Sequence, residues 1–136
     1  FGMFQSDSTS LLSIYPVVIY GIDINQGVDS YWSVTISWKN KSVKTIKSIR
    51  FSLVAVDEKD NIIECSDYQG SWTVFDALDP HRYGPGEGSF DKDYRWSNAV
   101  YGSRLAGVRL TGIYIEYTDG STASYINEED LVKMQE

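Results

Sequence analysis

Side chains that could perform nucleophilic catalysis are scarce in this sequence. His81 is the one histidine and Cys65 the one cysteine. A Ser-His-Asp triad would have to use His81 as its base, and no serine stands in the Gly-x-Ser-x-Gly pattern of a nucleophile turn. Cys65 lies in the segment Ile62-Ile63-Glu64-Cys65-Ser66, which is typical of a strand, where a lone cysteine is more often a buried small side chain than a nucleophile. We therefore expect no nucleophilic enzyme and no internal disulfide.

Pairs of carboxylates are a second source of chemistry. Asp91 and Asp93 lie two residues apart on an expected strand and so share a face. Asp76 and Asp79 lie beside the turn at Pro80. A glycosidase needs two carboxyl groups about 5–10 Å apart across a cleft. A sandwich of 136 residues rarely offers such a cleft, so a small glycan-active hydrolase is only the third hypothesis.

Ligands for metals and phosphates are not clustered in the sequence. The run Asp91-Lys92-Asp93 lacks the third donor and the glycine of a calcium loop. The alternating glycines between 84 and 88 are not followed by a Lys-Ser pair and a helix, as they would be in a phosphate-binding loop. No spacing of histidine and cysteine matches a zinc site. We predict that the protein binds no metal or cofactor and is not an enzyme.

Aromatic residues form 14% of the chain, with ten tyrosines and four tryptophans. Many fall in the irregular segment 67–101, which is rich in glycine and proline. Exposed aromatic rings in loops are typical anchors for partners, because they bury a large area at low entropy cost. We predict an exposed rim from Tyr83 to Tyr101. Its binding residues are expected to be Tyr83, Tyr94, Trp96 and Tyr101.

Two kinds of partner fit such a rim. The leading hypothesis is a non-catalytic domain that recognises another protein, because aromatics and acids are mixed in this segment. The alternative is a carbohydrate-binding module that uses exposed Trp and Tyr, whose rings also stack on sugars. A third interpretation, in which these rings close one end of the fold as core residues, stays open.

The net charge of −7 argues against a nucleic-acid partner, because phosphate binding is driven by counterion release on basic surfaces. Five of the twelve basic residues do fall close together. We interpret this run as an edge strand that lysines protect against pairing with other chains. It consists of Lys39, Lys41, Lys44, Lys47 and Arg50.

The first residue and the hydropathy suggest where the protein resides. No stretch reaches the 18 or more apolar residues of a membrane-spanning helix. The chain begins with Phe1 rather than Met, which predicts a processed product of an exported bacterial protein. We expect an extracytoplasmic location, either secreted, periplasmic or attached to the cell envelope. An export signal or a lipid anchor would then lie upstream.

Alternating apolar residues predict an all-β fold. Val34, Ile36 and Trp38 alternate with polar residues, as in a strand with one buried face. The strand after Ile46 has a slip at residues 47–48, and a later strand has one at residues 111–112, so we expect a β-bulge at each. Residues 1–13 are expected to form a flexible leader, and residues 14–136 a single β-sandwich domain of about seven strands.

The sequence also predicts one hairpin turn, one helix cap and five core residues. Asp119-Gly120 predicts a two-residue type I′ hairpin turn, which needs positive φ at both central residues. Asn127 is expected to cap a short C-terminal helix. Five residues are expected to be almost fully buried on facing sheets: Trp38, Phe51, Leu53, Ile113 and Ile115.

Three segments resemble uncharacterised bacterial immunoglobulin-like β-sandwich domains. The first is the turn and run Lys39-Asn40-Lys41-Ser42-Val43-Lys44-Thr45-Ile46-Lys47 before a long strand. The second is the Gly-Pro turn at residues 83–87, and the third is the closing Ile-x-Ile-x-Tyr-x-Asp-Gly hairpin of residues 113–120. The resemblance covers roughly residues 34 to 126 and implies an immunoglobulin-like sandwich of unassigned function.

Overall fold

The structure of the protein is a computed structural model that describes residues 15–26, 31–67, 70–90, 92–97 and 106–135. The predicted leader, residues 1–13, lies outside the described residues, as does Tyr101. Ten strands and one short helix occur in the described part of the chain, where about seven strands were predicted. All strand pairing within the sheets is antiparallel. The predicted all-β class with a short C-terminal helix is confirmed.

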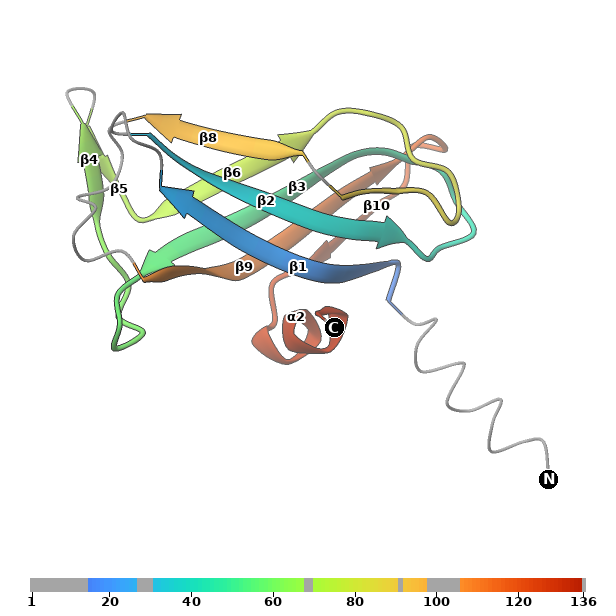
Figure 1. The fold of residues 1–136 in the computed structure, drawn as a ribbon. Coiled ribbons are helices and arrows are strands. Elements are labelled where there is room, and N and C mark those ends of the chain that lie inside the picture. The colour runs from blue at the N-terminus through green and yellow to red at the C-terminus, as the bar shows by residue number, and fades with distance from the viewer. Residues whose placement is uncertain (1–14, 27–30, 68–69, 91, 98–105, 136) are drawn as a thin grey trace.

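Two four-stranded sheets form the body of the molecule (Figure 1). Sheet A contains β1 (Val17–Gln26), β2 (Tyr31–Asn40), β7 (Gly88–Ser89) and β8 (Asp93–Ser97), and both short strands pair with β2. Sheet B has the order β10-β9-β3-β6, with bounds Thr122–Tyr125, Gly107–Tyr117, Ile46–Val56 and Val74–Asp79. A separate hairpin joins β4 (Cys65–Asp67) to β5 (Gly70–Trp72).

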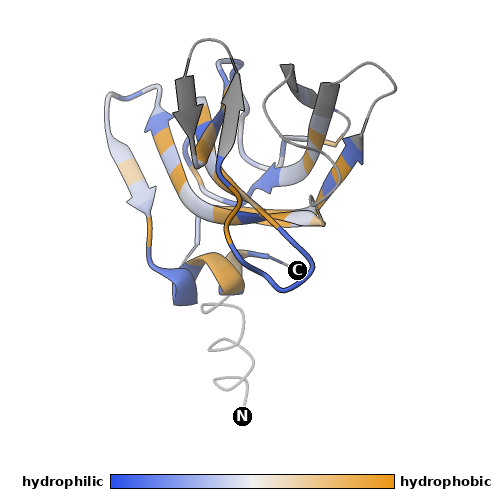
Figure 2. Ribbon diagram, turned by 90° about the vertical axis from the view of Figure 1, so that its left-hand side faces the viewer, coloured by the Kyte–Doolittle hydropathy of each residue, from blue (hydrophilic) through white to orange (hydrophobic). Residues whose placement is uncertain are grey.

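The core lies between sheets A and B. Hydrophobic and hydrophilic residues alternate along the strands (Figure 2), so each sheet turns one apolar face inward. The rings of Trp38 from β2 and Phe51 from β3 meet edge to face, with centroids 6.1 Å apart. The five predicted core residues are at most 2% exposed, which confirms the prediction.

Both predicted bulges occur in the pairing of β3 with β9. The register shifts between Ile46 and Ser48, and again where Thr111 is extra opposite Ser52 and Leu53. Each bulge lets the strand return its apolar side chains to the core after the sequence has slipped by one residue. Ile46 and Ile49 are therefore both fully buried, although their spacing is odd.

The predicted edge strand of basic residues is wrong. β3 lies between β6 and β9, and β2 lies between β1 and the two short strands of sheet A. The lysine amino groups instead reach acidic side chains of the neighbouring hairpin, with Lys44 Nζ 3.2 Å from Asp119 Oδ2 and Lys47 Nζ 3.6 Å from Glu116 Oε2. Lysines can thus sit on a central strand when its outer face is open to solvent.

The hairpin between β9 and β10 has a three-residue loop, 118–120, so the predicted two-residue turn is wrong. The Tyr117 N–H donates to the Ser121 carbonyl at 2.9 Å, and the Gly120 N–H donates to the Tyr117 carbonyl at 3.0 Å. Gly120 has a φ of 88°, but Asp119 does not adopt positive φ. The Asp119 carboxylate accepts the Ser121 N–H, which stabilises a loop ending in a glycine bulge.

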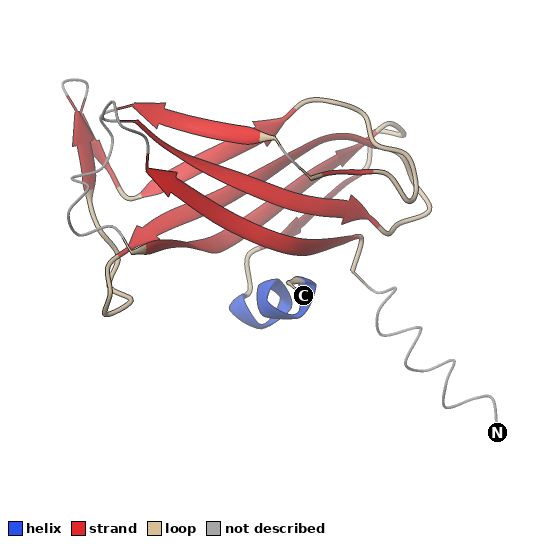
Figure 3. Cartoon of the chain, in the orientation of Figure 1, coloured by secondary structure: helices blue, strands red, loops and turns tan. Residues whose placement is uncertain are grey.

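Helix α2 (Glu128–Met134) closes part of the open side between β1 and β9 (Figure 3). The predicted cap is confirmed, because Asn127 Oδ1 accepts the Glu129 N–H at 2.8 Å. Leu131 and Met134 are buried in the core. After the helix, Gln135 forms a parallel bridge with Ile19 of β1. The covered part of the β1 edge therefore ends close to Ile19.

Candidate binding site

Tyr83, a predicted binding residue, is half-buried and packs against the core. Its ring lies edge to face on Trp38, with centroids 4.7 Å apart, and its Oη donates to Asp79 Oδ2 at 2.6 Å. Burial, together with the hydrogen bond to Asp79 and the charge of that residue, raises the pKa of Tyr83 to about 12. The predicted exposure of this ring is wrong, because the turn that carries it folds back over the end of the core.

Asp79 ends β6 with a carboxylate that has no exposed surface. Besides Tyr83, it accepts the His81 N–H at 3.1 Å, and His81 Nδ1 lies 2.8 Å away. Lys92 Nζ lies 3.7 Å from Asp79 Oδ1, the oxygen that also contacts His81. Burial opposes ionisation, but the hydrogen bonds from Tyr83 and His81 and the charge of Lys92 hold the pKa of Asp79 below its usual value. This carboxylate joins β6 to the following turn and is not free for acid–base chemistry.

Of the other three predicted binding residues, the structure describes the side chain of Tyr94 alone. Tyr94 on β8 is 8% exposed, and burial raises its pKa. Trp96 lies on the same strand, in register with Trp32 of β2, but its side chain lies outside what the structure describes. The exposure of Tyr94 was expected because the residue falls in the irregular, glycine-rich segment 67–101. That expectation is wrong, since the ring faces the core of the sandwich.

An exposed aromatic pair lies elsewhere, where Tyr20 of β1 meets Phe90 in the segment after β7. The ring centroids are 5.8 Å apart with an interplanar angle of 28°. The two residues are 42% and 54% exposed. Ser37 Oγ of β2 donates to the Phe90 carbonyl at 3.0 Å and so fixes the segment that carries the ring. Phe90 belongs to the aromatic-rich segment 67–101 in which the sequence predicted the binding site, whereas no sequence signal pointed to Tyr20, which follows a run of apolar strand residues.

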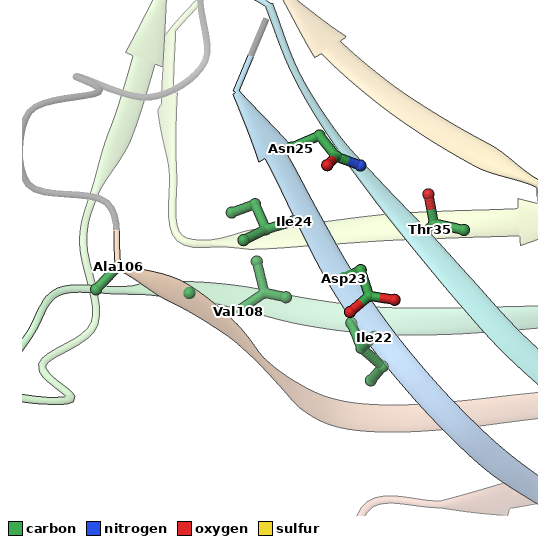
Figure 4. A pocket seen from close by; sticks show the side chains of 8 residues that line it. Ile22, Asp23, Ile24, Asn25, Thr35, Ala106 and Val108 are labelled. Atoms are coloured by element: carbon green, nitrogen blue, oxygen red, sulfur yellow. The ribbon is translucent and has the colours of Figure 1, made fainter.

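A groove of about 680 Å³ runs beside β1 (Figure 4). Residues 22 to 25 of β1 line one side, Thr35 of β2 lies next to them, and residues 106 to 108 at the start of β9 line the other side. Ile22, Ile24 and Val108 are half-buried against the core, whereas Asp23 and Asn25 are exposed. The exposed lining of the groove is thus mostly polar, with the apolar side chains of Ile22, Ile24 and Val108 on the core side. No motif in the sequence indicated it, because its walls come from distant segments.

The described residues provide neither a metal site nor a membrane-spanning helix. Among them, no three His, Cys, Asp or Glu side chains are placed to hold a metal ion. No helix in the described part of the chain is long and apolar enough to cross a membrane. Asp91 lies outside the described residues, and the side chains of Asp93 and Cys65 are not described. The predicted extracytoplasmic location stays a prediction.

Comparison with known proteins gives information about the fold and none about the function. No protein-family model matches the chain, and no curated protein matches it. A hypothetical protein from Peptoclostridium difficile 630, known from a 1.85 Å X-ray structure, is similar with a TM-score of 0.55 and 12% sequence identity. The match covers 88% of this chain and 91% of that one. At this identity the likeness concerns the fold alone.

Proposed function

We propose that this chain is a non-catalytic, immunoglobulin-like binding domain that recognises a protein partner through the surface around Tyr20 and Phe90. The observation that carries the proposal is the exposed, stacked pair that these two rings form beside sheet A. Single exposed apolar residues are common on any protein, whereas adjoining large rings are enriched at binding surfaces. The proposal keeps the predicted kind of function but moves its site away from Tyr83 and Tyr94.

Strand order supports the immunoglobulin-like part of the proposal. β1, β2 and β8 are neighbours in one sheet, as strands A, B and E are in immunoglobulin domains. β3, β9 and β10 are neighbours in the other sheet, as strands C, F and G are. β6 pairs with the remaining side of β3, which is the position of strand C′ in variable-type domains.

Preorganisation of the aromatic pair favours binding. An aromatic side chain has only two rotatable bonds, so its burial by a partner costs little entropy. The hydrogen bond from Ser37 holds the Phe90 backbone before any partner arrives, and such rigidity lowers the free-energy cost of association. Both rings stand on the outer side of sheet A, so a partner can cover them without opening the core.

Replacement of both rings by serine tests the proposal. The full chain and the double variant Tyr20→Ser, Phe90→Ser are immobilised, and proteins retained from the source organism are identified and quantified by mass spectrometry. The control is Val43→Ser, which alters a side chain that is 92% exposed in the β2–β3 turn. We expect the double variant to lose one specific partner by roughly tenfold or more, with an unchanged melting temperature. Equal retention by the wild type and the double variant would contradict the proposal.

A carbohydrate-binding module is the second candidate, and the same ring pair favours it. Exposed tyrosine and phenylalanine rings offer flat apolar faces to the C–H face of a sugar. A glycan array probed with the wild type and the same two variants separates the candidates. Binding to an oligosaccharide that disappears in the double variant, without a retained protein, would replace the protein partner by a glycan.

A further inference from the structure

One edge of β1 is unpaired in the described structure. From Gly21 to Gln26 this strand pairs with β2 on one side, and no described strand lies on its other side. β10 pairs with β9 only opposite residues 113–116, so the earlier part of β9 is likewise open. Unpaired N–H and C=O groups along a strand edge are a template for the addition of another strand.

Lining residues of the groove show that it follows this edge. Ile22, Asp23, Ile24 and Asn25 are consecutive, and their side chains alternate between the two faces of sheet A. A hollow over one face would be lined by every second residue. All four line the groove, together with residues 106 to 108 and with Thr35, which pairs with Asp23 across β1. The groove therefore follows the β1 edge that faces β9 and also extends over one face of β1 to β2 (Figure 4). The four residues span about 13 Å, enough for four to five residues of an added strand.

The molecule already places a backbone segment on the same edge. Gln135, just after α2, forms a parallel bridge with Ile19. Immediately beyond, at Tyr20, the pairing of β1 with β2 shifts by one residue, and the groove begins at Ile22. The edge is therefore continuous from a covered part at Ile19 to an uncovered part at residues 22–25. A parallel segment fits the first part and indicates the direction for the second.

We infer that the edge of β1 accepts an extended segment of the protein partner as an added parallel strand. This inference rests on the proposed function and states how the partner is held. Alternate side chains of the added segment lie inward, in the space between Ile22, Ile24 and Val108, and are small and apolar. The remaining side chains lie outward beside Asp23, and at least one of them is basic.

Charge supports the basic side chain. Asp23 is exposed, and its carboxylate makes no ion pair within the residues that the structure describes. The chain as a whole carries a net charge of −7. An acidic protein attracts basic segments over a distance of about one Debye length, 8–10 Å at physiological salt. A partner segment of opposite charge is thus both steered to the groove and stabilised beside it.

The test uses a display library of random linear peptides of about nine residues, which overlap the groove at both ends. The library is selected on the full chain, and one enriched peptide is resynthesised for binding measurements. We expect enriched peptides to alternate β-branched and polar residues, with Lys or Arg among the polar ones. N-methylation of the amides on one edge of the bound peptide should abolish binding. N-methylation on the opposite edge should leave it within about twofold, since those amides face solvent.

A charge-swap variant supplies the second arm. Asp23→Lys changes an exposed side chain and is expected to lower affinity for the basic peptide by about two- to fivefold, because exposed ion pairs are weak. Selection on this variant should then enrich acidic peptides. The serine variant of Tyr20 and Phe90 is measured in parallel. Loss of partner capture in that variant, combined with equal effects of both N-methylation patterns, would overturn strand addition but leave the proposed function standing.

Other outcomes also decide against the inference. A library that yields no peptide above background overturns the inference. It is also overturned if Asp23→Lys enriches the same peptides as the wild type and neither N-methylation pattern changes the affinity of the resynthesised peptide. A dimer in sedimentation experiments that Asp23→Lys dissociates would assign the edge to a second copy of this chain rather than to a partner. Enriched peptides that protect backbone amides of β9 rather than β1 from hydrogen exchange would move the site to the other wall of the groove.

Discussion

Replacement of Asp79 by alanine is expected to destabilise the fold, because this buried carboxylate accepts hydrogen bonds from Tyr83 and His81 that an alanine side chain cannot accept. Its Oδ2 receives the Tyr83 hydroxyl at 2.6 Å, and its Oδ1 receives the His81 N–H at 3.1 Å. Tyr83 is half-buried, so its unpaired hydroxyl costs about 1.5–3 kcal/mol. His81 is exposed and can turn to water, so its lost bond costs about 0.5–1 kcal/mol. The free energy of unfolding should therefore fall by about 2–4 kcal/mol.

Urea unfolding followed by tryptophan fluorescence measures this change. The matched control is Asp76→Ala, which removes an exposed carboxylate from the same strand β6, where it accepts a hydrogen bond from Ser52 Oγ at 2.6 Å. One such bond contributes about 1 kcal/mol. If Asp79→Ala costs no more than Asp76→Ala, the network around Asp79 does not stabilise the fold as reasoned.

The pH dependence of Asp79→Asn gives an independent check. The folded-state pKa of Asp79 is lower than its ordinary value of 3.8. Ionised Asp79 therefore stabilises the folded state above that ordinary value, and the contribution is lost as the pH falls through the lower folded-state pKa. The wild type should exceed Asp79→Asn in stability at pH 7 by more than at pH 2–3. A gap that stays constant with pH would show that Asp79 does not titrate with folding.

Four further substitutions are expected to reduce stability in the same urea assay. Phe51→Ala should cost about 3–5 kcal/mol by leaving a cavity against Trp38, and an unchanged midpoint would place the ring outside the core. Gly120→Val should cost about 1–2 kcal/mol, because a β-branched residue resists the φ of 88°; no change would mean that the loop adjusts. Tyr94→Ala should cost about 3–5 kcal/mol, contrary to the exposure expected from sequence, and a loss below 1 kcal/mol would restore that expectation. Asn40→Ala should cost about 2–4 kcal/mol, since its buried amide donates to the Lys44 and Tyr83 carbonyls at 2.9 and 3.0 Å; a neutral effect would show that water replaces it.

Local pattern alone determined much of the framework. Alternation over many residues predicted the burial of Trp38 and Phe51, because side chains of a strand point to opposite faces with a period of two. The slips in that alternation located both bulges, and Asn127 located the helix start. These features depend on neighbours in the chain, so one sequence suffices to read them.

Short strands and turns were predicted less well than long strands. Strand β8 has five residues, too few for its period to stand out, and so Tyr94 was expected in solvent. In the closing hairpin, Asp119-Gly120 fits both a two-residue turn and a three-residue loop. In the structure Asp119 accepts the Ser121 N–H within the three-residue loop and pairs with Lys44 of the connection between β2 and β3, a contact that the local pattern does not show.

The candidate site was decided by tertiary structure. Tyr20 and Phe90 meet because β1 and the segment after β7 both flank β2, a neighbourhood set by strand order rather than by spacing in the sequence. The groove exists because α2 covers the open side of the sandwich only near Ile19, leaving Ile22 and Ile24 beside β9. Alternation fixes which face a side chain occupies, but only the packing of the two sheets decides which edges are left without a partner.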